Sequence, residues 1–199
     1  KKWGDVAAMQ KIELTQIATQ DIWKKKKKKA LVVNKDFSAK RKADLVKVMK
    51  AIMEACIWLD VPANRKKTAD IIGKAPYVNA NNDVIEDRLN GEYNLGCNLG
   101  KKIYKGDQMA FHKGGAVNFP RKSHAIWAMA QFVRFGYLKE APDYKAIADK
   151  LILTDLYKQV AASMKIKVPA DDMKPFSLTM DKTVFDPANP AAYLKVVKK

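Results

Sequence analysis

The spacing of apolar residues predicts a chain that is mostly helical, with a few short strands near its start. The clearest helix covers residues 38–59, where apolar side chains recur on one face: Leu45, Val48, Ile52, Cys56 and Leu59. Asp60-Val61-Pro62 should end this helix, because proline disfavours helix in the residue before it. Residues 14–19 alternate like a strand, and the run 30–33, Ala-Leu-Val-Val, predicts a short buried strand.

Helices continue downstream. A second helix is predicted over 63–72, ending at Gly73, and a third should be capped by Asn82 or Asp83. The glycine-rich stretch 91–115 predicts a long irregular loop, and loops of that length are usually functional or packed against something else.

The C-terminal part also predicts helices. The helix that begins at Ser123 is apolar nearly all round, so it should be buried on several sides. Two further helices are expected over 143–153 and 154–166, the second capped by Thr154. A turn-rich segment, 185–190, should lead into a short terminal helix. Two or three strands are marginal alone, so we expect the early strands to complete a sheet whose other strands lie elsewhere.

Composition sets broad limits. A chain of 199 residues, 48% of them hydrophobic, suits one domain or two small lobes with a real core. No apolar stretch approaches the roughly 20 residues needed to span a bilayer. The first residues lack the apolar core of a signal peptide, so either the protein is not exported or its leader is not part of this chain.

The net charge of +17 suggests a polyanion as partner, but its origin weakens that interpretation. Only five of the 38 basic residues are Arg, the residue that nucleic-acid readers favour for bidentate contacts. The lysines are scattered, apart from the run Lys24 to Lys29. That run could be a solvated arm, a helix with repelling charges, or a loop in which one lysine turns inward to pair with an anion.

The sequence offers little for catalysis. His112 and His124 have no second His or Cys at ligand spacing, so no metal site is expected. The motifs of a nucleophile elbow, a phosphate-binding Walker loop and a dinucleotide fingerprint are all missing. Cys56 and Cys97 suggest no disulfide framework. We therefore expect neither an enzyme nor a bound cofactor.

Several segments, taken together and in order, resemble the nitrate- and bicarbonate-binding proteins of ABC importers. No single segment is decisive, but the ordered set is specific and spans essentially the whole chain. The matching stretches are Trp3-Gly4-Asp5, 15–24, Lys29-Ala30-Leu31, Tyr77-Val78-Asn79, 88–96, 118–127, 134–138, 185–190 and Tyr193-Leu194.

The resemblance implies a fold and a function. Family members are considerably longer, and this chain is similar only to their C-terminal half. Residues 1–199 would then be the helix-rich C-terminal half of a two-lobed, type II α/β periplasmic-binding fold whose N-terminal half is missing, which would explain the unpaired strands. Such proteins are receptors that carry a small inorganic oxyanion to the membrane permease of an ABC importer. They work in the periplasm or anchored at the outer face of the cytoplasmic membrane. Nitrate is the first choice, with bicarbonate and nitrite still open.

The resemblance also points to site residues. In the family, the segment after a tryptophan reads Trp-Lys-x-His-Pro-Glu-Lys, and its last lysine is an anion ligand, which corresponds to Lys29. A compact ammonium group suits a small, diffuse oxyanion. The same comparison places Trp3 beside the cleft. This chain departs from the family by having lysine where proline is usual, at positions 2, 27 and 42.

Two other hypotheses remain at this stage. One is a sensor for nitrate built on the same fold. The other, from a different class, is a basic nucleic-acid-binding protein, whose binding should weaken steeply with salt.

Overall fold

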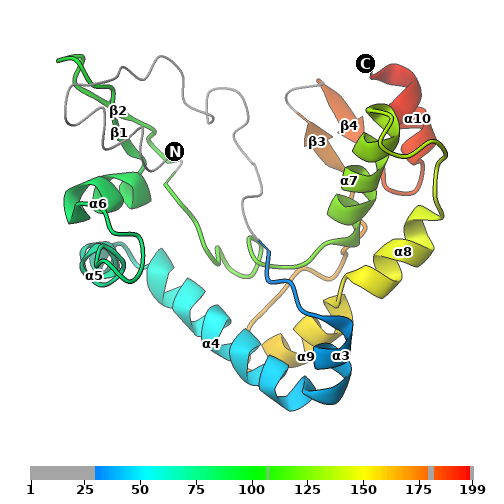
Figure 1. The fold of residues 1–199 in the computed structure, drawn as a ribbon, viewed down its shortest axis with the longest axis horizontal. Helices are drawn as coiled ribbons and strands as arrows, with labels where there is room; N and C mark the ends of the chain where they lie inside the picture. Colours follow the sequence, from blue (N-terminus) through cyan, green and yellow to red (C-terminus); the bar gives the residue numbers. More distant parts are fainter. Residues whose placement is uncertain (1–29, 107, 179–181, 198–199) are drawn as a thin grey trace. The chain divides into compact units, whose positions relative to one another are not determined.

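The structure is a computed structural model, and it describes residues 30–106, 108–178 and 182–197. The described residues belong to two compact units, one formed by 52–113 and the other by 30–51 together with 114–197. The elements follow in this order (Figure 1): α3 Lys35–Lys40, α4 Lys42–Asp60, a 3-10 turn Pro62–Asn64, α5 Arg65–Ile72, α6 Asn82–Asn90, β1 Glu92–Asn94, β2 Lys101–Ile103, α7 Lys122–Arg134, α8 Tyr144–Leu151, α9 Thr154–Ser163, β3 Phe176–Leu178, β4 Thr183–Phe185 and α10 Pro190–Val196.

The first predicted helix is two helices, α3 and α4, which meet at Arg41. Asn34 caps α3, because its side-chain oxygen accepts the N–H of Asp36 at 2.8 Å. α4 begins at Lys42, where the resemblance leads one to expect proline, a residue that favours the first helical position. It ends at Asp60, before Pro62, as predicted.

The buried side of α4 is only partly the predicted one. Leu45 is buried, but so is Met53, which was not on the predicted face. Val48 and Ile52, which were on it, are 44% and 39% exposed. Apolar residues surround most of this helix, so their spacing alone did not show which side the described residues cover.

The unit formed by 52–113 packs α5 against α6 around a small core of Ala69, Ile85 and Leu89. α5 ends at Gly73 as predicted. α6 is capped by Asn81 and not by Asn82 or Asp83, because the Asn81 side chain is the one that accepts the N–H of Asp83.

The glycine-rich stretch is more ordered than predicted. Gly91 ends α6 in the left-handed conformation, with φ of 80°, which a residue without a Cβ adopts at little cost. The chain then forms an antiparallel hairpin in which Tyr93 pairs with Lys102 between β1 and β2. The prediction of an irregular loop over 91–115 was therefore partly wrong.

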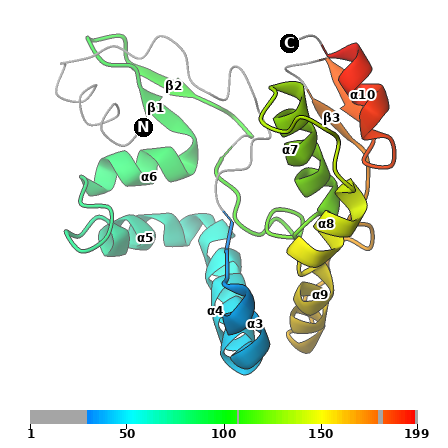
Figure 2. The ribbon, with the colours of Figure 1, turned by 45° about the vertical axis from the view of Figure 1, so that its right-hand side comes forward.

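The other unit holds the larger core. α7, α8 and α10 gather beside the hairpin of β3 and β4 (Figures 1 and 2), and their inward side chains include Ile126, Phe185 and Tyr193. α7 is buried on one side only, since Phe132 and Phe135 are exposed. Thr154 is the first residue of α9 and not its cap; its hydroxyl donates to the carbonyl of Pro120 instead.

The predicted buried strand at 30–33 is neither a strand nor buried in the described structure. It has no regular secondary structure and leads into α3, with Leu31 53% and Val32 85% exposed. Each described strand has one partner, in two separate hairpins, and 30–33 joins neither. The strand predicted at 14–19 lies outside the described residues. No helix in the described ranges is both long and apolar enough to cross a bilayer.

Phe185 should be the side chain on which the larger core depends most. It is fully buried in β4. Its ring is tilted against that of Phe176, with ring centroids 5.6 Å apart, and meets that of Tyr193 edge to face at 5.2 Å. Phe185→Ala is expected to lower the free energy of unfolding by about 3–5 kcal/mol, because it leaves a cavity. Urea denaturation followed by circular dichroism measures the change. Val184→Ala, on the exposed neighbour in the same strand, should cost under about 1 kcal/mol; equal losses would contradict the core assignment.

Candidate functional site

The two residues predicted to bind the anion, Lys29 and Trp3, lie outside the described residues, as does the whole run Lys24 to Lys29. The distance between Lys29 and Trp3 is therefore not part of the description, and their predicted roles stay predictions. What it does describe is the chain immediately after Lys29, the segment 30–33, in which Leu31 and Val32 are exposed. It also describes most of the other stretches that carried the resemblance, so their chemistry can be assessed.

In the described part of the chain, the carboxylate of Asp60 is bound by main-chain N–H groups in the way that a protein binds a small anion. Asp60, the last residue of α4, accepts main-chain N–H bonds from three consecutive residues: Phe111 at 2.7 Å, His112 at 2.9 Å and Lys113 at 2.6 Å. Consecutive main-chain N–H groups that converge in this way form an anion-binding concavity. Here the protein's own carboxylate fills it, and the glycine-rich stretch is tied to the end of α4.

The electrostatics of Asp60 agree with this geometry. Partial burial alone would raise its pKa, but the three N–H donors of Lys113, Phe111 and His112 together hold the pKa below the ordinary value of 3.8. The nearby His112 ring acts in the same direction. Asp60 is therefore ionised near neutral pH, and it links the end of α4 to residues 111–113 by hydrogen bonds.

The guanidinium groups of the two arginines in the same unit contact other groups of the protein. Arg65 is buried, and its guanidinium donates to the carbonyls of Leu89 and Met109, the latter at 3.0 Å. Arg88 stacks on the ring of Tyr93, with its central carbon 3.3 Å from the ring centroid. Neither guanidinium is arranged to receive a solute anion.

In the other unit, acidic side chains surround the cation that starts α7. Lys122 lies 2.8 Å from a carboxylate oxygen of Asp149 and 3.7 Å from one of Asp172. The hydrogen bond to Asp149 raises the pKa of Lys122. The ammonium groups of Lys122 and Lys145 in turn lower the pKa of Asp149 to about 2. In this network the positive charges of Lys122 and Lys145 are matched by the negative charges of Asp149 and Asp172.

The remaining described stretches of the resemblance build turns, caps and packing. Asn118 accepts the hydroxyl of Tyr157 at 2.9 Å, which ties the segment before α7 to α9. Asn189 caps α10 by accepting the N–H of Ala192. Gln131 of α7 donates to the Tyr193 hydroxyl of α10 at 3.1 Å. These residues hold the scaffold rather than a ligand.

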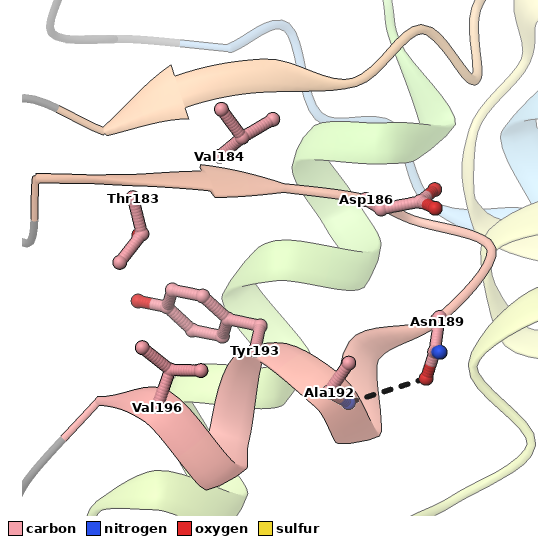
Figure 3. Close-up of a pocket in the computed structure, with 7 residues that line it drawn as sticks. All are labelled: Thr183, Val184, Asp186, Asn189, Ala192, Tyr193 and Val196. Carbon is pink, nitrogen blue, oxygen red and sulfur yellow. Dashed lines mark hydrogen bonds between the residues drawn. The ribbon is translucent and has the colours of Figure 1, made fainter.

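A shallow pocket of about 300 Å³ lies between β4 and α10 (Figure 3). It is a poor site for an oxyanion, because one of its lining side chains is a carboxylate and none is a lysine or arginine. The lining residues are Thr183, Val184, Asp186, Asn189, Ala192, Tyr193 and Val196. Within the described part of the chain, no group of His, Cys, Asp and Glu side chains could hold a metal ion either.

Sequence reasoning missed Asp60 as a site of anion-type coordination and treated it only as the end of a helix. Its partners lie 51 to 53 residues away. A single sequence holds no local signal for a contact over that distance.

Comparison with known proteins finds relatives that are named for the binding or import of nitrate or bicarbonate. Residues 3–73 match the model of the NMT1-like family. The nitrate/nitrite binding protein NrtA of Synechococcus elongatus is 31% identical over 98% of this chain, which spans 44% of that protein. The bicarbonate-binding protein CmpA of the same organism is 27% identical over 98% of this chain. The nitrate import ATP-binding protein NrtC of Synechocystis is 24% identical over 97% of this chain and matches 28% of that protein's length.

The fold has a counterpart among solved structures. The crystal structure of the periplasmic nitrate-binding protein NrtA from Synechocystis PCC 6803 superposes with a TM-score of 0.89 and 26% identity. The match covers 100% of this chain and 52% of that one. The predicted periplasmic-binding-protein-like α/β fold is thereby confirmed. The chain spans about half the length of the receptors that it matches.

Asp60→Asn should loosen the glycine-rich stretch. The amide retains one acceptor oxygen but loses the charge, so the N–H groups of Phe111 to Lys113 should exchange faster with solvent, at a cost of about 1–3 kcal/mol. Hydrogen–deuterium exchange at single-amide resolution measures this. Glu54→Gln, elsewhere on α4 and exposed, is the matched control and should change nothing at these amides.

The pH dependence of this protection has a defined sign. Because the pKa of Asp60 is lowered in the folded protein, its contribution is fully present above 3.8 and is lost as the pH falls through the folded-state pKa. Protection that persists unchanged in Asp60→Asn would show that the carboxylate does not hold this segment.

Proposed function

We propose that this chain, which is similar to the nitrate- and bicarbonate-binding proteins, forms the C-terminal half of a receptor that binds a small oxyanion for an ABC importer. The observation that carries the proposal is the similarity to NrtA over 98% of this chain, together with the 0.89 TM-score against a nitrate-binding protein. A fold alone does not establish a function, but here sequence and fold point to the same class of protein.

The lengths of the matched proteins support the proposed division into halves, and the resemblance to the C-terminal half of the family supports the assignment of this chain to that half. The chain accounts for 44% of the Synechococcus NrtA and 52% of the solved Synechocystis chain. We infer that residues 1–199 supply the C-terminal half and that an N-terminal half completes the two lobes. The anion would bind between the lobes, so part of its site lies outside these 199 residues.

Lys29 is the proposed anion ligand of this half, with Trp3 beside it. An ammonium group attracts an anion more strongly where burial lowers the screening, which for Lys29 would require that the exposed apolar segment Ala30 to Val33 be covered in the whole protein. Arg65, Arg88 and Lys122 already have partners within the protein, and the proposal assigns the binding of the anion to Lys29, Trp3 and the other half.

Nitrate is the proposed ligand, since three nitrate/nitrite binding proteins are 28–31% identical to this chain. Bicarbonate is the alternative offered by CmpA. The working step is reversible binding with closure of two lobes, so no catalysis is assigned. We place the receptor in the periplasm or at the outer face of the cytoplasmic membrane, where it would deliver its anion to the membrane permease.

The similarity to NrtC supports a second candidate. A unit of this size also occurs within a protein named as the ATP-binding component of nitrate import. The same fold could therefore serve as a nitrate-sensing part of such a protein. The higher identity and larger matched share of NrtA favour the receptor.

Nitrate should stabilise the protein that includes both halves, and Lys29→Ala should abolish most of this effect. Removing one partner of a buried charge pair costs about 2–5 kcal/mol, which corresponds to a loss of affinity of roughly 30-fold or more. Isothermal titration with nitrate and with bicarbonate measures the affinity. Lys28→Ala, the neighbouring substitution in the same run, is the matched control and should bind nearly as well as the original protein.

A parallel titration with duplex DNA tests the nucleic-acid alternative. Salt-dependent DNA binding without any response to nitrate or bicarbonate would refute the receptor proposal. Equal losses in Lys28→Ala and Lys29→Ala would refute the specific role of Lys29.

A further inference from the structure

The loop of residues 111–113 binds both oxygens of one carboxylate through its main chain. Oδ1 of Asp60 accepts the N–H of Phe111 at 2.7 Å, and Oδ2 accepts the N–H groups of His112 and Lys113 at 2.9 and 2.6 Å. Hydrogen bonds to an ionised acceptor are roughly twice as strong as those between neutral groups. The loop therefore recognises a planar group that carries two oxygens on one trigonal centre.

The place of Asp60 in α4 is not one that the helix itself favours. Asp60 is the last residue of α4, where the helix dipole is unfavourable to a negative charge, and the last turn contains no basic residue. Within the described residues, neither a lysine nor an arginine forms an ion pair with Asp60. Its charge is thus stabilised chiefly by the N–H groups of the loop.

The chain just before this loop is held by contacts that do not involve Asp60. The N–H of Met109 donates to the carbonyl of Leu89 at 3.2 Å, and Arg65 donates to the carbonyl of Met109 at 3.0 Å. The side chains of Met109 and Phe111 pack against the small core of α5 and α6. The loop should therefore keep its shape when the Asp60 carboxylate is removed.

The loop also lies within reach of solvent and beside a further polar atom. Lys113 is exposed, and Asp60 and His112 are half-buried. The His112 ring is close enough to help lower the pKa of Asp60. Its Nδ1 atom is buried and has no hydrogen-bond partner in the described part of the chain. A solute anion at this loop would therefore meet the three N–H groups with an imidazole nearby.

We propose that the loop 111–113 is a binding site for one small planar anion, such as a carboxylate or nitrate, and that Asp60 is its built-in occupant. Because Asp60 belongs to the same chain, it competes at an effective concentration on the order of millimolar or higher. The native protein should therefore keep this site closed to solute anions, and removal of the Asp60 carboxylate should open it. The inference concerns residues 60 and 111–113 alone and does not rest on the proposed receptor function.

Chemical rescue tests the proposal in the protein that includes both halves. Asp60→Ala should speed hydrogen–deuterium exchange of the Phe111, His112 and Lys113 amides at least about fivefold, because their shared acceptor is lost. With a dissociation constant on the order of 10 mM, about 100 mM formate should restore roughly tenfold protection at these amides. Nitrate should act in the same way, since it is also planar and trigonal. Formate should change nothing in the original protein.

Asp60→Asn is the matched control, because its side-chain amide fills the space of the carboxylate. The same three amides should exchange faster in this variant, but formate should not protect them. Protection by formate in Asp60→Asn would place the anion elsewhere and overturn the proposal. Equal protection of Asp60→Ala by chloride at the same ionic strength would show a general salt effect and also overturn it, as would a failure of both formate and nitrate to protect.

A second variant covers the case in which Asp60→Ala does not fold. Asp60→Ser also leaves room for formate, and refolding of either variant on addition of formate, followed by circular dichroism, would support the site. Unfolding of both variants that formate does not reverse would overturn it. The readout is local to residues 111–113, so rescue in a protein without the Lys29-dependent nitrate binding would refute the receptor proposal and leave this site standing.

Discussion

α4 is apolar around most of its circumference, and a helix of that kind must be packed on more than one side. The described residues bury Leu45 and Met53 and leave Val48 and Ile52, which share a face with Leu45, exposed. The same helix runs through both compact units. Within the described residues, α4 therefore keeps exposed apolar surface, and the segment 30–33 pairs with neither hairpin.

The charged groups of Asp60, Arg65 and Lys122 bond to other groups of the described protein. The Asp60 carboxylate closes a three-amide concavity, Arg65 donates to two carbonyls, and Lys122 lies between two aspartates. Each is satisfied by partners far away in sequence, which restrains loops without adding a ligand. The high net charge is thus a poor guide to function. Its most informative part is one lysine at the end of a run, before an apolar segment.

Local signals predicted the helices well. α4 ends before Pro62 as proline chemistry predicts, and α10 follows a turn-rich segment as expected. α5 ends at Gly73 as predicted, although Gly73 has a right-handed backbone conformation, with φ of −66°, and not the left-handed one of a typical glycine cap. The errors arose where a residue's state depends on distant partners. Asn81 rather than Asn82 caps α6, which is a shift of a single residue. The segment 30–33 has the composition of a strand, but a strand needs a neighbour that the described residues do not supply.

By itself, the sequence determined the helical pattern, the poverty of catalytic motifs and the resemblance that led to the receptor family, because all three are recorded in local residue order. It also pointed to Lys29 and Trp3, whose roles remain predictions. Only the tertiary structure decided which side of α4 is covered and which N–H groups hold Asp60, 51 to 53 residues away. Such choices depend on which surfaces meet after folding, and periodicity along one helix carries no information about the segment that will pack against it.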